Sequence, residues 1–153
     1  MLTIHSDAHF MKQALLQADI AEQQLEIPVG AVIVCENKII ARAHNQVEKL
    51  QDVTAHAEML AITAAQNYLS SKYLYQCTMY LTLEPCTMCA GALFWSQMGK
   101  LVIGARDLKR GFNLLNPVPL HPKTEVIFGM LETDCEAKIK GFFKKMRGKH
   151  KER

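Results

Sequence analysis

The chain reads Thr54-Ala55-His56-Ala57-Glu58 in one place and Pro85-Cys86-Thr87-Met88-Cys89 in another, and each stretch opens a segment expected to be helical. A Cys-x-x-Cys spacing at a helix start can place two thiolates on adjacent corners of a tetrahedron, the geometry that Zn²⁺ prefers. The positive N-terminal end of a helix also lowers a thiol pKa, which favours the anionic ligand form. We therefore predict that His56, Cys86 and Cys89 hold one Zn²⁺ per chain.

Glu58 belongs to the same predicted site without being a ligand. Residues two apart point about 200° from each other around a helix, so His56 and Glu58 can share a site only beyond the helix end. Two helices would then aim their N-termini at one ion. Three protein ligands leave a fourth position open for water, which is typical of catalytic zinc, whereas structural zinc usually has four protein ligands. Glu58 is the predicted catalytic acid and base that moves the protons.

Each of these residues has an ordinary interpretation when it is taken alone. A single His is usually a core or surface residue, a Glu in a first turn usually faces the helix dipole, and a lone Cys-x-x-Cys is often redox-active or half of a structural zinc site. Together they favour a catalytic site. The order His-x-Glu and then Pro-Cys-x-x-Cys is the known signature of zinc-dependent nucleobase deaminases.

The sequence around these stretches alternates between strand and helix patterns. We expect helices over 7–24, 54–68, 86–97 and 132–146, with Ser6 or Asp7 capping the first and Thr54 the second. We expect strands over 29–35, 39–43, 78–83, 100–105 and 124–128, a hairpin turn at 36–38, and irregular loops at 45–53 and 108–122. This order predicts an α/β sandwich with a mixed five-stranded sheet, formed by one domain over residues 1–153.

Composition is that of an ordinary globular domain. Hydrophobic residues make up 49% and charged residues 22% of the 153 residues. No apolar run approaches the roughly 20 residues of a membrane span, and Met1 to Asp7 does not have the pattern of a signal peptide. We therefore expect a cytoplasmic protein with no membrane partner. The five cysteines are an odd number, and we expect Cys35, Cys77 and Cys135 to be buried apolar residues rather than half-cystines.

Charge is distributed unevenly along the chain. Residues 138–153 carry eight Lys and Arg against one Glu, a net charge of +7, whereas residues 1–137 carry a net charge of −4. A mildly acidic body thus ends in a basic helix and tail at about 132–153. Such asymmetry indicates a polyanionic partner, of which nucleic acid is the commonest, although a merely solubilising end has the same composition.

Over nearly its whole length the sequence resembles the bacterial tRNA-specific adenosine deaminases of the cytidine/deoxycytidylate deaminase superfamily. Besides the two stretches quoted above, the resemblance rests on Pro28-Val29-Gly30-Ala31-Val32, Thr82-Leu83-Glu84-Pro85-Cys86, Met88-Cys89-Ala90-Gly91-Ala92, Gly104-Ala105-Arg106-Asp107 and Phe142-Phe143-Lys144-Lys145-Met146-Arg147. It implies a three-layer α/β/α fold and a homodimer whose neighbouring subunit helps to build the RNA site. It also implies hydrolysis of the wobble adenosine in a tRNA anticodon stem-loop to inosine, with release of ammonia.

The resemblance adds three candidate substrate-binding residues. By position, Asn45 resembles the base-contacting asparagine of the family, with an ordinary turn residue as the alternative. Arg106 and Asp107 resemble the residues that lie near the sugar and the neighbours of the flipped nucleotide. Their alternative is an ion pair at a strand end.

Two other functions stay open at this point. Phe94-Trp95-Ser96-Gln97 departs from the family sequence and is similar to the aromatic pair of free guanine deaminases, so a deaminase of a free base or nucleoside such as guanine or cytosine is the alternative enzyme. The loop over 108–115 departs from the family as well. A structural-zinc RNA-binding module is the non-enzyme alternative, and it predicts a fourth protein ligand and no need for Glu58.

Overall fold

The computed structural model describes residues 5–151, and the side chains of all of these except the last two. The helices are α1 (Asp7–Gln23), α2 (Val47–Leu50), α3 (Ala57–Leu69), α4 (Thr87–Ser96) and α5 (Glu132–Lys151), with a 3₁₀ turn η1 (Phe112–Leu114). The strands are β1 (Gly30–Cys35), β2 (Lys38–His44), β3 (Cys77–Leu83), β4 (Lys100–Ala105) and β5 (Glu125–Phe128).

The five strands form one mixed sheet, as the sequence predicts, and the structure gives their order as β2-β1-β3-β4-β5. β1 pairs antiparallel with both β2 and β3, while β3, β4 and β5 run parallel. The β1–β2 turn consists of Glu36 and Asn37, both with positive φ (51° and 62°), the combination that fits the twist of a two-residue hairpin. Lys38 already belongs to β2, so the turn is one residue shorter than expected.

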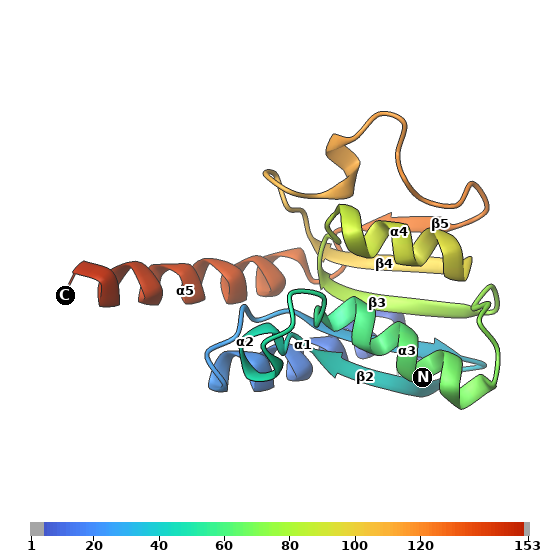
Figure 1. Cartoon of the computed structure of the whole chain (residues 1–153), viewed down its shortest axis with the longest axis horizontal. Coiled ribbons are helices and arrows are strands. Elements are labelled where there is room, and N and C mark those ends of the chain that lie inside the picture. Colours follow the sequence, from blue (N-terminus) through green and yellow to red (C-terminus); the bar gives the residue numbers. More distant parts are fainter. Residues whose placement is uncertain (1–4, 152–153) are drawn as a thin grey trace.

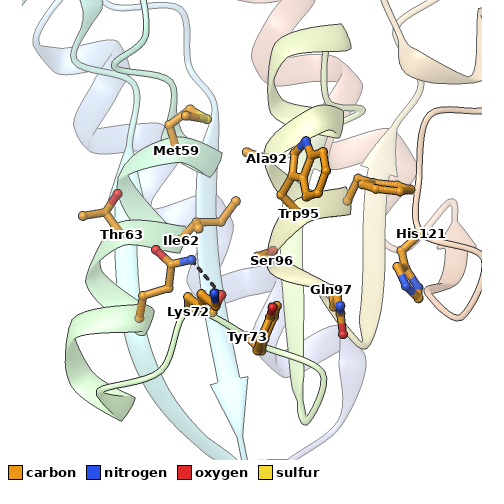
Figure 2. A pocket seen from close by; sticks show the side chains of 12 residues that line it. Met59, Ile62, Thr63, Lys72, Tyr73, Ala92, Trp95, Ser96, Gln97 and His121 are labelled. Atoms are coloured by element: carbon orange, nitrogen blue, oxygen red, sulfur yellow. Dashed lines mark hydrogen bonds between the residues drawn. The ribbon is translucent and has the colours of Figure 1, made fainter.

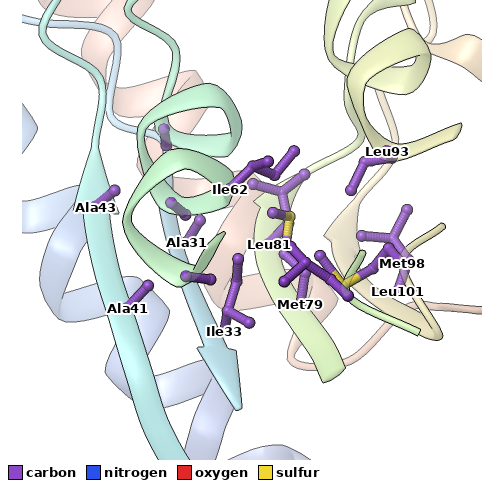
Figure 3. Close-up of a cluster of buried hydrophobic side chains, with 14 of the residues drawn as sticks. Ala31, Ile33, Ala41, Ala43, Ile62, Met79, Leu81, Leu93, Met98 and Leu101 are labelled. Atoms are coloured by element: carbon purple, nitrogen blue, oxygen red, sulfur yellow. The ribbon is translucent and has the colours of Figure 1, made fainter. Parts of the chain in front are cut away.

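Successive side chains along each strand point to opposite faces of the sheet, which produces two buried layers. Ala31 and Ile33 on β1 point into the cluster beneath α3 and α4, shown in Figure 3, whereas Val32 and Val34 point into the cluster beneath α1 and the start of α5. Burial of a side chain such as Ile33, which is fully buried, contributes about 1.5–3 kcal/mol. Helices therefore cover both faces of the sheet, which confirms the three-layer α/β/α fold (Figure 1).

Three details differ from the sequence prediction. Thr54 does not cap α3: its backbone N–H and hydroxyl both donate to the Asp52 carboxylate, and the helix begins only after His56. The loop at 45–53 contains the short helix α2. Helix α5 continues past Met146 to Lys151. The sequence predicts an end at Met146 because this is the last apolar residue, and a helical period cannot be recognised where every following residue is polar or glycine.

The topology brings several chain segments to one edge of the sheet. β2, β3 and β4 all end at this edge, and α3 and α4 begin there. Figure 1 shows α5 extending outward beyond it. Within residues 5–151, no helix is both long and apolar enough to cross a membrane. The carboxyl edge of the sheet is thus where the predicted site residues can meet.

Candidate metal centre

The starts of α3 and α4 face one another at the carboxyl edge of the sheet. His56 is the residue directly before α3 and Cys86 the residue directly before α4, and both have extended backbone (φ −74°, ψ 151° and φ −74°, ψ 177°). Neither side chain is used to cap its own helix. Because such a residue stands just outside the first turn, its side chain is free to project beyond the helix end. Cys89 lies in the first turn of α4 and adds a second thiol.

The three predicted ligands lie at distances that fit one zinc ion. His56 Nδ1 is 3.7 Å from Cys86 Sγ and 3.5 Å from Cys89 Sγ, and all three atoms lie within 4.8 Å of one another. Zinc–sulfur and zinc–nitrogen bonds of usual length at a tetrahedral angle put N and S about 3.6 Å apart. Among the described residues no fourth Cys, His or carboxylate joins this group.

The protonation of the thiols also suits a cation. Hydrogen bonds from Cys89 and then from His56 lower the pKa of Cys86 to about 3, so this thiol is a thiolate. The same contact with Cys86 raises the pKa of His56. Donation to the Cys86 thiolate, together with burial, raises the pKa of Cys89. A divalent cation held by these residues would supply the positive charge that ionises the second thiol as well.

Glu58 lies next to this group with its carboxyl removed from bulk water. Its side chain is on the first turn of α3 and is only 4% exposed. Burial raises the pKa of the carboxyl to about 7. A carboxyl group that titrates near neutral pH can both accept and return a proton under physiological conditions, which is the property of a general acid and base.

A cavity of about 420 Å³ opens onto His56, Glu58 and Cys86. Its remaining walls come from five segments: the loop before β1, the loop after β2, the β3–α4 connection, the loop after β4, and α5. The volume lies within the usual range for small-molecule sites. Together with the ligand geometry, the cavity makes this edge of the sheet the candidate active site.

Two of the three predicted substrate-binding residues line the cavity. Asn45 is buried, and its Oδ1 accepts the backbone N–H of Ala57 at 2.8 Å, so its amide NH₂ is the part left for a ligand. Asp107 Oδ1 accepts the backbone N–H groups of Lys109 and Arg110 at 3.1 and 3.0 Å. Its second carboxylate oxygen has no part in these two bonds.

Arg106 lies outside this cavity. Its guanidinium carbon is 3.9 Å from the centroid of the Phe128 ring, a cation–π contact, and the residue borders a separate hollow of about 280 Å³ beside α5. A role for Arg106 toward the substrate therefore stays a prediction.

Sequence reasoning missed several residues of the cavity wall. Glu26 and Glu84 are buried carboxylates, and each accepts two backbone N–H groups, Glu26 from α2 and Glu84 from the loop after β4. Phe142 and Met146 line the cavity from α5, and Arg110 does so from the loop after β4. One feature of the sequence indicates that these two acids are buried: each stands beside apolar residues and a proline rather than in a polar run.

A larger hollow, about 630 Å³, lies away from this centre between the outer surfaces of α3 and α4 (Figure 2). Trp95 borders it and is 77% exposed. The hollow contains none of the proposed ligands and not Glu58, so its size does not make it the active site.

Comparisons with known proteins agree with this geometry. Residues 4–105 match the family model described as the cytidine and deoxycytidylate deaminase zinc-binding region. The tRNA-specific adenosine deaminase of Bacillus subtilis is 44% identical over 95% of this chain and 93% of its own length. A solved tRNA:A34 deaminase that acts at the wobble position of transfer RNA superposes with a TM-score of 0.79 at 38% identity, covering 85% of this chain and 98% of that one. The guanine deaminase of Bacillus subtilis reaches 0.61 at 38% identity and covers 63% of this chain and 62% of its own.

Proposed function

The chain belongs to the cytidine and deoxycytidylate deaminase family and, within it, to the tRNA-specific adenosine deaminases, and we propose that it acts on the wobble adenosine of a tRNA anticodon. The enzyme hydrolyses adenosine in tRNA to inosine and ammonia and uses one zinc ion per chain. The observation that carries the proposal is the three-ligand group at a base-sized cavity, with a buried carboxyl beside it.

His56, Cys86 and Cys89 are the residues that would hold the zinc. When bound, the ion supplies Lewis-acid activation of a water molecule near neutral pH. Glu58 accepts one proton from this water on a carboxylate oxygen and delivers it to the ring nitrogen of adenine as the C–O bond forms. It then takes the remaining proton from the new hydroxyl group and delivers it to the amine, which leaves as ammonia when the C–N bond breaks. Its burial supports this role, because the carboxyl can hold the proton between the two transfers.

The cavity requires the adenosine to leave its stack. A volume of about 420 Å³ admits a nucleoside but not a folded stem or loop, so the base must be turned out of the RNA to reach Glu58. In this proposal Asn45 binds the base through its amide NH₂, and Asp107, in the loop after β4, binds the sugar side of the same nucleotide. The support is that both residues line the cavity.

Helix α5 supports RNA as the substrate. It carries the exposed cations Lys144, Lys145, Arg147 and Lys149 out beyond the sheet edge where the cavity opens, while Phe142 and Met146 of the same helix line that cavity. Phosphates of an anticodon stem-loop could contact these cations while one base occupies the site. A free base gains nothing from such a row of charges.

We also propose that each chain is one domain that pairs with a second copy in the cytoplasm. The support is the outer face of α3 and α4, where Trp95, Tyr73 and Met59 surround the 630 Å³ hollow (Figure 2). A large aromatic side chain left 77% exposed beside a hollow lined by both apolar and polar residues is typical of a protein–protein interface.

The alternative enzyme, a deaminase of free bases such as guanine, has one observation in its favour, the similarity to the guanine deaminase of Bacillus subtilis. Phe94-Trp95 supports it less than the sequence suggests, because Trp95 borders the α3–α4 hollow rather than the cavity at Glu58. The structural-zinc module needs a fourth protein ligand, and no described residue supplies one.

Ammonia release tests the proposal directly. The purified protein is given tRNA with adenosine at the wobble position and, separately, free guanine, cytosine, cytidine and adenosine, with Glu58→Gln as the inactive control. Turnover of the tRNA alone, with inosine at the wobble position, is the expected result. Turnover of guanine with none of tRNA would overturn it in favour of the alternative enzyme.

A further inference from the structure

The connection between β3 and α4 contains a buried acid that takes no part in the metal group. Glu84 is 4% exposed and stands two residues before Cys86. Its two carboxylate oxygens accept separate backbone N–H groups, that of Asp107 at 3.2 Å and that of Asn113 at 2.9 Å. Both donors belong to the first part of the loop after β4, so one side chain holds residues 107–113 at both ends of that stretch.

The backbone on either side of Glu84 reinforces this attachment. The Glu84 N–H donates to the Ala105 carbonyl at 2.8 Å, and the Pro85 carbonyl accepts the N–H of Phe112 at 3.0 Å. The segment that leads to Cys86 is therefore bonded to the loop at three places and to the end of β4 at a fourth. The two amide donors also compensate the cost of burying the Glu84 carboxylate, since hydrogen bonds to ionised groups are shorter and stronger than those between neutral groups.

Gly111 shows how closely the loop passes the carboxylate. A Cβ atom at this position would lie 2.1 Å from Glu84 Oε2, 2.3 Å from its Cδ and 2.6 Å from the Asp107 carbonyl oxygen. Real contacts of a methyl group are longer than 3 Å, so any side chain here displaces either the carboxylate or the loop. Glycine is the one residue that allows the loop to lie directly against Glu84.

The loop held in this way forms one wall of the cavity. Asp107 and Arg110 line it, and Asp107 Oδ1 accepts the N–H groups of Lys109 and Arg110. The direction of the Asp107 carboxylate thus depends on the loop backbone, and the loop backbone depends on Glu84. Glu58 and the three proposed ligands lie on the starts of α3 and α4, outside the loop.

We propose that Glu84 is a positioning residue for the substrate nucleotide, acting through the loop that carries Asp107 and Arg110. The proposal rests on the proposed function, because it takes the cavity to be the site of the reacting nucleotide. It assigns Glu84 to substrate binding and leaves proton transfer to Glu58. Loss of Glu84 therefore raises KM far more than it lowers kcat.

The principal test is Glu84→Gln in the full-length, zinc-loaded enzyme. Glutamine keeps the shape but offers one acceptor oxygen for two N–H donors, so one loop hydrogen bond to a charged group is lost. Such a loss predicts a KM for tRNA raised roughly tenfold or more, with kcat within about threefold of the parent. Hydrogen exchange should show faster exchange at the amides of Asp107 and Asn113, with zinc content unchanged.

Two further variants make the test specific. Glu125→Gln removes the same charge from the start of β5, at the opposite edge of the sheet, and should leave KM and kcat at parent values. Gly111→Ala pushes on the carboxylate from the loop side and should reproduce the KM increase if Glu84→Gln proves too unstable to measure. If Glu84 acts through Asp107, the KM effects of Glu84→Gln and Asp107→Ala should not add.

A purely structural role gives a different pattern. It lowers the melting temperature and the active fraction, so that kcat falls while KM keeps the parent value, and that result would overturn the proposal. Failure of the proposed function is seen separately in the parent enzyme, which would then turn over a free base and not tRNA. The same KM comparison made with that base decides the role of Glu84: an unchanged KM would again overturn it.

Discussion

Asn45 has two roles in the proposed site, one for each end of its amide group. Its Oδ1 accepts the N–H of Ala57 at the start of α3, where His56 uses its own side chain for the metal group rather than for capping. Asn45 also lines the cavity, and its NH₂ is the part of the amide that this bond leaves for a ligand. The asparagine thus supplies the cap that the ligand cannot, and the two roles can be separated by mutation.

We expect Asn45→Asp to keep the fold and weaken substrate binding. Aspartate retains the acceptor for Ala57 and is favourable at a helix N-terminus, but it has no amide hydrogen to donate. Asn45→Ala should lose the cap as well, at about 1 kcal/mol of unfolding free energy. Thermal denaturation and KM measured on both variants check this, and a parent-like KM in Asn45→Asp would remove Asn45 from the binding site.

Glu58→Gln should abolish most turnover and leave the metal in place. Glutamine fits the same buried space but cannot carry the proton, and removal of a general acid and base costs about 10²–10⁴-fold in rate. Steady-state kinetics and metal analysis on the same sample are the measurements. Retained activity would exclude the proton-transfer role, and lost zinc would make Glu58 a ligand.

Cys86→Ala and Cys89→Ala should both lose zinc and melt at a lower temperature. Metal binding contributes to folding, because the site is formed only in the folded chain. Cys35→Ala is the matched control, since this cysteine lies on β1 outside the metal group and should keep one zinc per chain. Full zinc content in either of the first two variants would contradict the ligand assignment.

At the scale of secondary structure, the position of α5 is what links a basic segment to the cavity. Lys138 on this helix forms ion pairs with Asp19 and Glu22 on α1, and Lys145 reaches Glu22 at 3.5 Å. Cys135, near the start of the helix, is fully buried against the sheet. These contacts hold α5 to the body from Cys135 as far as Lys145, and Phe142 within this stretch lines the cavity.

Neutralising α5 should weaken tRNA binding and its dependence on salt. Lys144→Gln with Arg147→Gln removes two candidate phosphate contacts, and each contact contributes roughly 0.7–0.9 to the slope of log K against log salt. The matched control is Lys38→Gln with Lys123→Gln, which removes two charges at the opposite edge of the sheet. Equal binding constants and slopes in the two double variants would mean that α5 only keeps the protein soluble.

At the scale of the whole molecule, the two outer layers serve different ends. Helix α5 of the α1–α5 layer lines the cavity and carries the proposed RNA-binding cations. The α3–α4 layer exposes Trp95 and its hollow to solvent (Figure 2). The active site lies at the N-terminal ends of α3 and α4, whereas Trp95 and its hollow lie on the outer sides of these helices. A second copy can therefore pair with the outer side without covering the active site.

Trp95→Lys should convert a dimer into a monomer. A buried charge without a partner costs several kcal/mol, enough to dissociate an interface of ordinary size. Leu16→Lys on α1 is the control, because this side chain is 54% exposed and lies in the opposite layer. It should leave the molar mass of the dimer unchanged. Light scattering after size exclusion measures both, and a monomeric parent protein would refute the homodimer.

The sequence by itself determined the local chemistry and the secondary structure. The spacing of His56, Glu58, Cys86 and Cys89 predicted a metal site with a candidate acid and base beside it, because those residues lie at two helix starts whose geometry is fixed by φ and ψ. Alternating apolar residues specified the strands for the same reason. Local patterns of this kind repeat over a few residues and can be read without knowing the fold.

Only the tertiary structure decided where the cavity lies and which residues line it. The contact between Glu84 and Gly111, the place of Phe142 in the cavity wall, and the stacking of Arg106 on Phe128 away from it all join residues with no periodic relation in the sequence. Such contacts depend on how strand ends and loops pack in space. A buried carboxylate is fixed by whichever backbone N–H groups packing brings to it, and one-dimensional spacing does not record which these are.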